Sequence, residues 1–174
     1  MAAADPVLYS LLCALAFALA AAVITWAVSF VKADVSIVDG VWSLLILGAG
    51  LVFAWTLPEH GPRTVGVLML AALWALRLSA HIIRRNHGAP EDHRYRAIRA
   101  RNQPHFEWKS LYLVFILQAV LAWIVALPLA AAVAGSTALG WLDAAGAALV
   151  LFGLVFESVA DWQLARFLRR RDAA

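Results

Sequence analysis

The sequence predicts an all-α integral membrane protein, a bundle of five transmembrane helices with its N-terminus outside and its C-terminus in the cytoplasm. Of its 174 residues, 64% are hydrophobic and only 14% are charged, against roughly 45–50% and about 25% in soluble domains. The apolar residues gather in five long runs, and most Lys and Arg residues gather in two short segments. These three observations argue against an ordinary soluble globule.

Five apolar runs are close to the length that a helix needs to cross a bilayer. A helix rises about 1.5 Å per residue, so a hydrocarbon core of about 30 Å takes about 20 apolar residues. The approximate spans are Leu8–Val31, Val41–Leu57, Val65–Ile83, Ser110–Ala134 and Ala144–Leu164. Because Met1–Pro6 carries no basic side chain, the first run is expected to remain as a span rather than to be removed as a signal peptide. Residues 1–174 then form a single transmembrane domain.

The distribution of basic residues predicts how these spans are oriented. Seven of the fourteen Lys and Arg residues lie in the loop Arg84–Lys109, called the basic loop below, and four more follow Leu164. The connections His60–Thr64 and Gly135–Asp143 hold one and none. Since short basic loops remain in the cytoplasm, the basic loop and the C-terminus are expected there.

Ionisable side chains in the third and fifth spans are the first candidates for a site. Arg77 and His81 are four residues apart, as are Glu157 and Asp161, so each pair shares one face of its helix. Asp39 lies just before the second span. Because a charge in hydrocarbon costs at least about 2.5–3.5 kcal/mol, the two pairs are expected to converge. They either serve a function or act only as ion pairs that hold the helices together.

The basic loop reads RRNHGAPEDHRYRAIRARNQPHFEWK, and a helix is expected to start near Pro90–Asp92, since Pro and acidic residues favour helix N-termini. Guanidinium groups bind phosphate through paired hydrogen bonds, so Arg94 and Arg99 could hold a phosphate while Tyr95 stacks on a nucleotide base. Alternatively, the same arginines contact anionic lipid headgroups at the membrane surface.

Other classes of site are not favoured by the sequence. The single cysteine, Cys13, excludes a disulfide framework within the chain and any multi-cysteine metal centre. The five histidines show no HxxxH or HExxH spacing, so no metal site is expected. Nucleic acid is not expected as a partner, because the basic loop is tied to the membrane at both ends.

Five segments follow one another from Asp34 onward and cover most of the remaining chain. They are DVSIVDGVW (Asp34–Trp42), LWALRLSAHIIRRNHG (Leu73–Gly88), EDHRYRAIR (Glu91–Arg99), LYLVFILQA (Leu111–Ala119) and FESVADWQLARF (Phe156–Phe167). Together, and in this order, they resemble the bacterial domain-of-unknown-function branch of the steroid 5-alpha-reductase superfamily.

The resemblance implies an integral membrane reductase of about seven helices in the bacterial inner (cytoplasmic) membrane. Such an enzyme transfers hydride from NADPH, which enters from the cytoplasm, to the carbon–carbon double bond of a lipid-like enone. By the same resemblance, Glu157 and Asp161 contribute to the cofactor pocket and Arg169 contacts phosphate. The chain ends at RRRDAA, where similar proteins continue with an RHPNY-like motif and further helices. It is therefore expected to correspond to their first five helices and to bind NADPH weakly or not at all.

Two hypotheses follow for the function. In the first, the protein is a reductase in which Arg77 or His81 donates a hydrogen bond to the enone oxygen, Asp39 positions that donor, and the arginines of the basic loop hold NADPH. Donors aimed at the developing negative charge would contribute a few kcal/mol each. In the second, the protein is not a catalyst and uses the same polar residues to bind lipid headgroups or a partner helix bundle.

Overall fold

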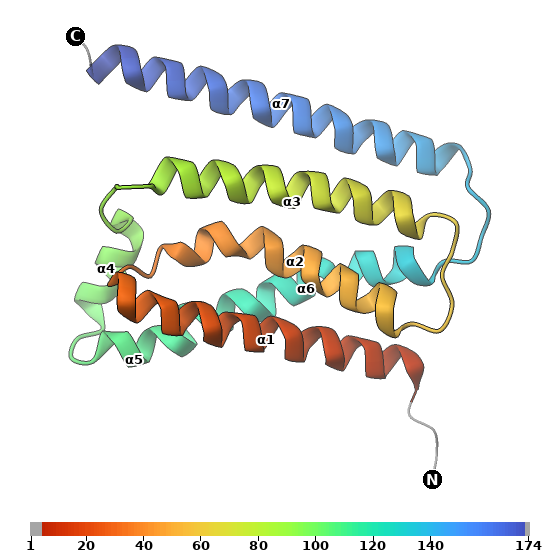
Figure 1. The fold of residues 1–174 in the computed structure, drawn as a ribbon, viewed down its shortest axis with the longest axis horizontal. Coiled ribbons are helices and arrows are strands. Elements are labelled where there is room, and N and C mark those ends of the chain that lie inside the picture. Colours follow the sequence, from red (N-terminus) through yellow and green to blue (C-terminus); the bar gives the residue numbers. More distant parts are fainter. Residues whose placement is uncertain (1–4, 173–174) are drawn as a thin grey trace. The chain divides into compact units, whose positions relative to one another are not determined.

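The structure is a computed structural model that describes residues 5–172, and every regular element in that range is helical (Figure 1). The elements are α1 (Pro6–Lys32), α2 (Ile37–Thr56), α3 (Thr64–Asn86), α4 (His93–Arg101), α5 (Phe106–Ser110), the π-helix η1 (Leu111–Ile116), α6 (Leu117–Ala134) and α7 (Trp141–Asp172). Within the described range, five helical stretches are long and apolar enough to cross a membrane. The prediction of five helices that are long and apolar enough to span a membrane is therefore confirmed.

The chain divides after Thr137 into two compact units. The first unit contains α1 to α6, with the short helices α4 and α5 gathered at one end (Figure 1). The second unit contains α7, which follows the connection after Thr137 as one continuous helix of 32 residues.

The helices extend beyond the spans expected from the sequence. The second helix begins at Ile37 rather than Val41, so Asp39 lies in its first turn and not before it. The third helix continues to Asn86, and the fourth spanning stretch begins at Phe106. Apolar length predicts where a helix crosses hydrocarbon, but the helix itself continues through polar residues until its backbone groups find other partners.

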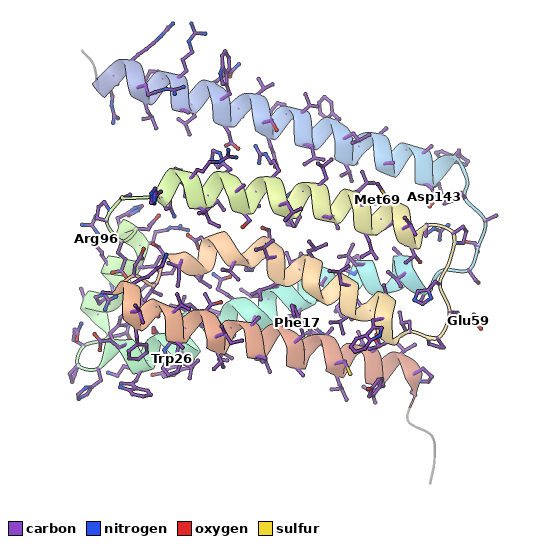
Figure 2. The ribbon with its side chains drawn as sticks, in the orientation of Figure 1. Phe17, Trp26, Glu59, Met69, Arg96 and Asp143 are labelled. Atoms are coloured by element: carbon purple, nitrogen blue, oxygen red, sulfur yellow. The ribbon has the colours of Figure 1, made fainter. Side chains whose placement is uncertain are left out.

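The centre of the first unit is built from α1, α2 and α6. Its first core cluster consists of Ala14, Leu45, Ile46, Ala49, Phe53, Leu57, Ala122, Ala126 and Val133. Alanines on α1 and α6 let the helices approach closely, as is typical of membrane bundles. Gly48 of α2 serves the same purpose, because a Cβ atom there would overlap the ring of Phe17, which Figure 2 labels on α1.

Two serine side chains fix α3 against the first half of α2. The Ser43 hydroxyl donates a hydrogen bond to the carbonyl oxygen of Ala75 (3.0 Å), and the Ser79 hydroxyl donates to that of Gly40 (2.6 Å). Ser43, Ser79 and Gly40 are all buried. Because an unpaired hydroxyl is costly in an apolar interior, these bonds favour a single register of the antiparallel pair.

A second core cluster joins the short helices to the bundle. It consists of Ala18, Ala22, Val35, Val38, Tyr95, Phe106, Val114, Phe115 and Ala119. Beside it, the rings of Trp26, Phe30 and Trp108 form a group with centroids 4.9–5.5 Å apart. The indole nitrogen of Trp26, labelled in Figure 2, donates a hydrogen bond to the carbonyl oxygen of Glu107 (2.9 Å). These contacts hold α5 against the end of α1.

The π-helix η1 was not expected from the sequence. Its residues, Leu111–Ile116, are all apolar or aromatic, and Val114 and Phe115 are buried in the second core cluster. Nothing in such a run distinguishes the wider π turn from the α turn, because both bury the same kind of side chain.

The predicted orientation can be tested by labelling single cysteines on a C13A background. Gln103, between α4 and α5, and Glu59, between α2 and α3, are both exposed and lie at opposite ends of the first unit (Figures 1 and 2). If the basic loop is cytoplasmic, an impermeant thiol reagent added to intact cells should label a cysteine at Glu59 and spare one at Gln103. Labelling at Gln103 from outside would reverse the predicted topology.

Candidate functional site

The carboxylate of Asp39 is the centre of a hydrogen-bond network between α2 and α4. It accepts a hydrogen bond from the Tyr95 hydroxyl (2.7 Å) and one from the Arg94 guanidinium (2.8 Å). Its side chain is 17% exposed, so the partners replace much of the water that would otherwise solvate the charge. Tyr95 and Arg94, which lie 56 and 55 positions later in the chain, thus stabilise the charge in the first turn of α2.

Asp92 holds the side chain of Arg94 in position for its contact with Asp39. It is the N-cap of α4, as the expected helix start near Pro90–Asp92 implied, and its carboxylate accepts from the Arg94 backbone N–H (2.9 Å). The same carboxylate accepts from Nε of the Arg94 side chain (3.1 Å). Arg94 therefore bridges two carboxylates, although its side chain is still 56% exposed.

Tyr95 lies in the second core cluster with only 5% of its surface exposed. Burial of the ring, followed by the hydrogen bond to Asp39, raises the pKa of its hydroxyl well above the usual value, so the group stays protonated and donates. In this structure a nucleotide base could stack on the ring only after Tyr95 had left the cluster. The observed position instead makes Tyr95 an anchor for α4.

Arg99 and Glu91 form a second link between α4 and the bundle. The guanidinium donates two hydrogen bonds to the Glu91 carboxylate (3.0 and 2.8 Å) and lies over the Phe106 ring, 4.7 Å from its centroid. Glu91 also accepts from the backbone N–H of Val35 (3.0 Å), in the turn between α1 and α2. Arg99 and Glu91 therefore hold α4, α5 and this turn together.

Both acidic residues before α4 are adapted to their charged form. Burial alone would raise the pKa of Glu91, but the hydrogen bonds from Arg99 and Val35 and the positive charge of Arg99 outweigh it, so this pKa is lowered. The pKa of Asp92 is lowered chiefly by its hydrogen bonds from Arg94. The network is therefore built for ionised carboxylates.

The basic loop divides into arginines that brace the fold and arginines that face outward. Arg99 belongs to the first group, whereas Arg96 is exposed and lies on the outer side of α4 in Figure 2. Arg94 belongs partly to both groups, because its half-exposed guanidinium has donors besides those bound to Asp39 and Asp92. A phosphate would therefore fit Arg94 and Arg96 better than Arg99 or Tyr95.

Arg77 and His81 lie on the side of α3 that faces away from α2. Ala75 and Ser79 mark the face in contact with α2, and two residues along a helix correspond to a rotation of about 200°. Arg77, between them, is therefore on the opposite face, and His81 shares that face one turn later. The described bonds of Asp39 run to α4 and not to this face.

The remaining predicted residues lie on α7, in the second unit. Glu157 and Asp161 are four residues apart on this continuous helix, as expected, and Arg169 is in its last turn. Arg77, His81, Glu157 and Asp161 all take part in polar or electrostatic interactions. The third span belongs to the first unit and the fifth to the second, so their convergence stays a prediction.

No local pattern in the sequence indicates the long-range role of Glu91. It was recognised only as an acidic residue at a helix start, and its contacts with Arg99 and Val35 span 8 and 56 residues. Trp42 is a second residue whose environment the sequence does not indicate. Its indole nitrogen is buried and has no hydrogen-bond partner among the described residues.

Comparison with known proteins relates the chain to one family. The sequence profile of a family described as protein of unknown function, DUF1295, matches residues 25–174. No curated protein and no solved structure that was compared matches the chain significantly. The match includes all the predicted site residues.

We expect Asp39 and Tyr95 to be energetically coupled. Tyr95→Phe should lower the free energy of unfolding in detergent by about 1–3 kcal/mol, because the carboxylate loses a donor. Asp39→Ala should cost at least as much, since it leaves the buried Tyr95 hydroxyl without its acceptor. The double variant should cost less than the sum of the two. Tyr112→Phe, at an exposed tyrosine of η1, is the matched control, and strictly additive losses would contradict the coupling.

The lowered pKa of Glu91 predicts acid sensitivity with a defined sign. Because the folded pKa lies below the unfolded value of about 4.3, the stabilisation is fully present above that value and is lost as the pH falls through the folded pKa. Unfolding measured between about pH 7 and pH 3 should therefore show a smaller loss of stability for Glu91→Gln than for the wild type. Equal slopes would show that the carboxylate is not responsible.

Proposed function

The chain belongs to the DUF1295 family, and we propose that it is a membrane-embedded reductase that uses NADPH to reduce the carbon–carbon double bond of a lipid-like enone. The class of reaction comes from the resemblance of five segments to the steroid 5-alpha-reductase superfamily. The geometry of the first unit supports it through the position of α4. This helix carries four arginines and is hydrogen-bonded to the first turn of a helix that is long and apolar enough to span a membrane.

The position of α4 is the observation that carries the proposal. Asp39 binds Arg94 and Tyr95 at the start of α2, and the Ser79–Gly40 bond brings the last turns of α3 to the same level. A phosphate on the outward side of α4 would therefore lie at the end of the bundle where Arg77 and His81 occur. A cofactor with its phosphates at α4 would have its reactive part directed toward apolar helices that suit a lipid-like substrate.

The residues of α4 fit the phosphates of the cofactor in part. Arg94 and Arg96 would hold them, since guanidinium groups are suited to phosphate oxygens. Arg99 and Tyr95 would position α4 through Glu91 and Asp39 rather than touch the cofactor. Glu157, Asp161 and Arg169 enter the proposal by resemblance alone. When bound, NADPH supplies the hydride.

The substrate side of the reaction needs a hydrogen-bond donor at the enone oxygen. Negative charge develops on that oxygen as the double bond is reduced, and a fixed donor in a dry pocket stabilises it by a few kcal/mol. The sequence offers Arg77 and His81 for this role. Both lie on the face of α3 away from α2.

One observation favours a second candidate function, the binding of anionic lipid headgroups without catalysis. Arg99 and Tyr95 are bound by Glu91 and Asp39, whereas Arg96, on the outer side of α4 in Figure 2, is exposed. An amphipathic helix at a membrane surface would also present outward arginines.

Nucleotide titration of the 174-residue protein in lipid nanodiscs separates the two functions. The reductase proposal expects NADPH to bind about tenfold more tightly than NADH, because the additional phosphate meets a guanidinium, and expects this preference to fall with salt. Arg96→Ala should reduce the preference, whereas Arg101→Ala, an exposed arginine in the last turn of α4, should leave it. Because the 174-residue protein is expected to bind NADPH only weakly, the ratio of the two affinities is the quantity compared, and equal affinities would contradict the proposal. A melting temperature that depends instead on the anionic lipid fraction would favour the second function.

A further inference from the structure

The indole nitrogen of Trp42 is a buried donor that lacks a partner among the described residues. Two other tryptophans of the first unit are satisfied, since Trp26 donates to the carbonyl of Glu107 (2.9 Å) and Trp123 to that of Leu11 (3.0 Å). A buried N–H without an acceptor is costly, and such groups are rare unless they serve a ligand, a water or an ion. The position of Trp42 therefore requires an explanation.

Trp42 lies next to the Asp39 network. The two residues are three apart on α2, so they are neighbours on the helix surface, with Trp42 about 4.5 Å further into the bundle. Trp42 packs against the first core cluster, formed by α1, α2 and α6. It thus stands on the interior side of α2, one turn below the place where α4 is attached.

The surroundings of Trp42 indicate what could accept its hydrogen bond. The cluster against which it packs contains only apolar side chains, among them Ala14, Leu45 and Ala122. A water molecule would need two to four polar partners, and the described hydrogen bonds of Asp39, the nearest carboxylate on α2, run to α4. A carboxylate or phosphate would lose its hydration without a counter-charge. A ketone oxygen on an apolar molecule avoids both costs, because it needs only one donor and brings its own hydrocarbon surroundings.

We propose that the indole N–H of Trp42 binds the carbonyl oxygen of the lipid-like substrate. This inference rests on the proposed function and names the donor that the reaction needs. Arg77 and His81 are less suited, because they lie on the face of α3 away from α2 and already interact with other groups. The substrate class is accordingly a lipid with a ketone oxygen at one end, held one turn inside the bundle from Asp39.

Infrared spectroscopy of a bound ketone tests this inference directly. The probe is cholestenone with an isotope-labelled carbonyl, added to the 174-residue protein in nanodiscs and compared with cholestene, which lacks the oxygen. In the wild type the carbonyl band should move to lower frequency. Trp42→Phe should abolish this shift and weaken cholestenone binding about tenfold, while cholestene binding is unchanged. Trp55→Phe, an 87% exposed tryptophan of the same helix, is the matched control.

A second variant separates the hydrogen bond from packing. Benzothienylalanine at position 42 keeps the size of the ring and lacks the N–H, so it should act like Trp42→Phe even if that variant folds poorly. The proposal is overturned if the wild type shows no shifted band, if either variant retains the shift, or if both probes lose affinity equally. A shifted band that depends on Trp42, together with equal affinities for NADPH and NADH, would support this inference while refuting the reductase.

Discussion

The carboxylate of Asp39 is the constraint on which the arrangement of the first unit depends. It is the one charged residue of α2 and stands in the first turn of a helix that is long and apolar enough to span a membrane, so partners that balance its charge stabilise this end of the bundle. Tyr95 and Arg94 balance it, and both come from α4. The helix that solvates the charge is thereby fixed over the end of α2.

Glu91 complements Asp39 from the other direction. Its carboxylate comes from the segment before α4 and satisfies a backbone N–H in the turn between α1 and α2, while holding Arg99. Asp39 of α2 thus binds side chains of α4, and Glu91, just before α4, binds the turn between α1 and α2. The pair determines which arginines are committed to structure and which, like Arg96, are left to face a ligand or the membrane surface.

The sequence predicted the parts of the fold that depend on local composition. Apolar length was enough to find the five helices that could span a membrane, and the acidic residues after Pro90 were enough to place the start of α4. The network could not be predicted, because Asp39 and Val35 meet partners about 56 positions away. The roles of the arginines of α4 could not be predicted either, because residue type alone does not show whether an arginine binds phosphate or holds a helix in place. Only their partners distinguish Arg99 from Arg96.

Helix geometry also limits which candidate residues can act together. On α2, Gly40 and Ser43 face α3, whereas Trp42 packs toward α1 and α6. On α3, Arg77 points away from that same contact. A substrate oxygen cannot be bound by Trp42 and Arg77 at once, because α2 and α3 are packed together between them. The choice of donor therefore decides on which side of the α2–α3 contact the proposed chemistry takes place. The indole N–H of Trp42 has no partner among the described residues, whereas Arg77 already interacts with other groups. Trp42 is for this reason the better candidate.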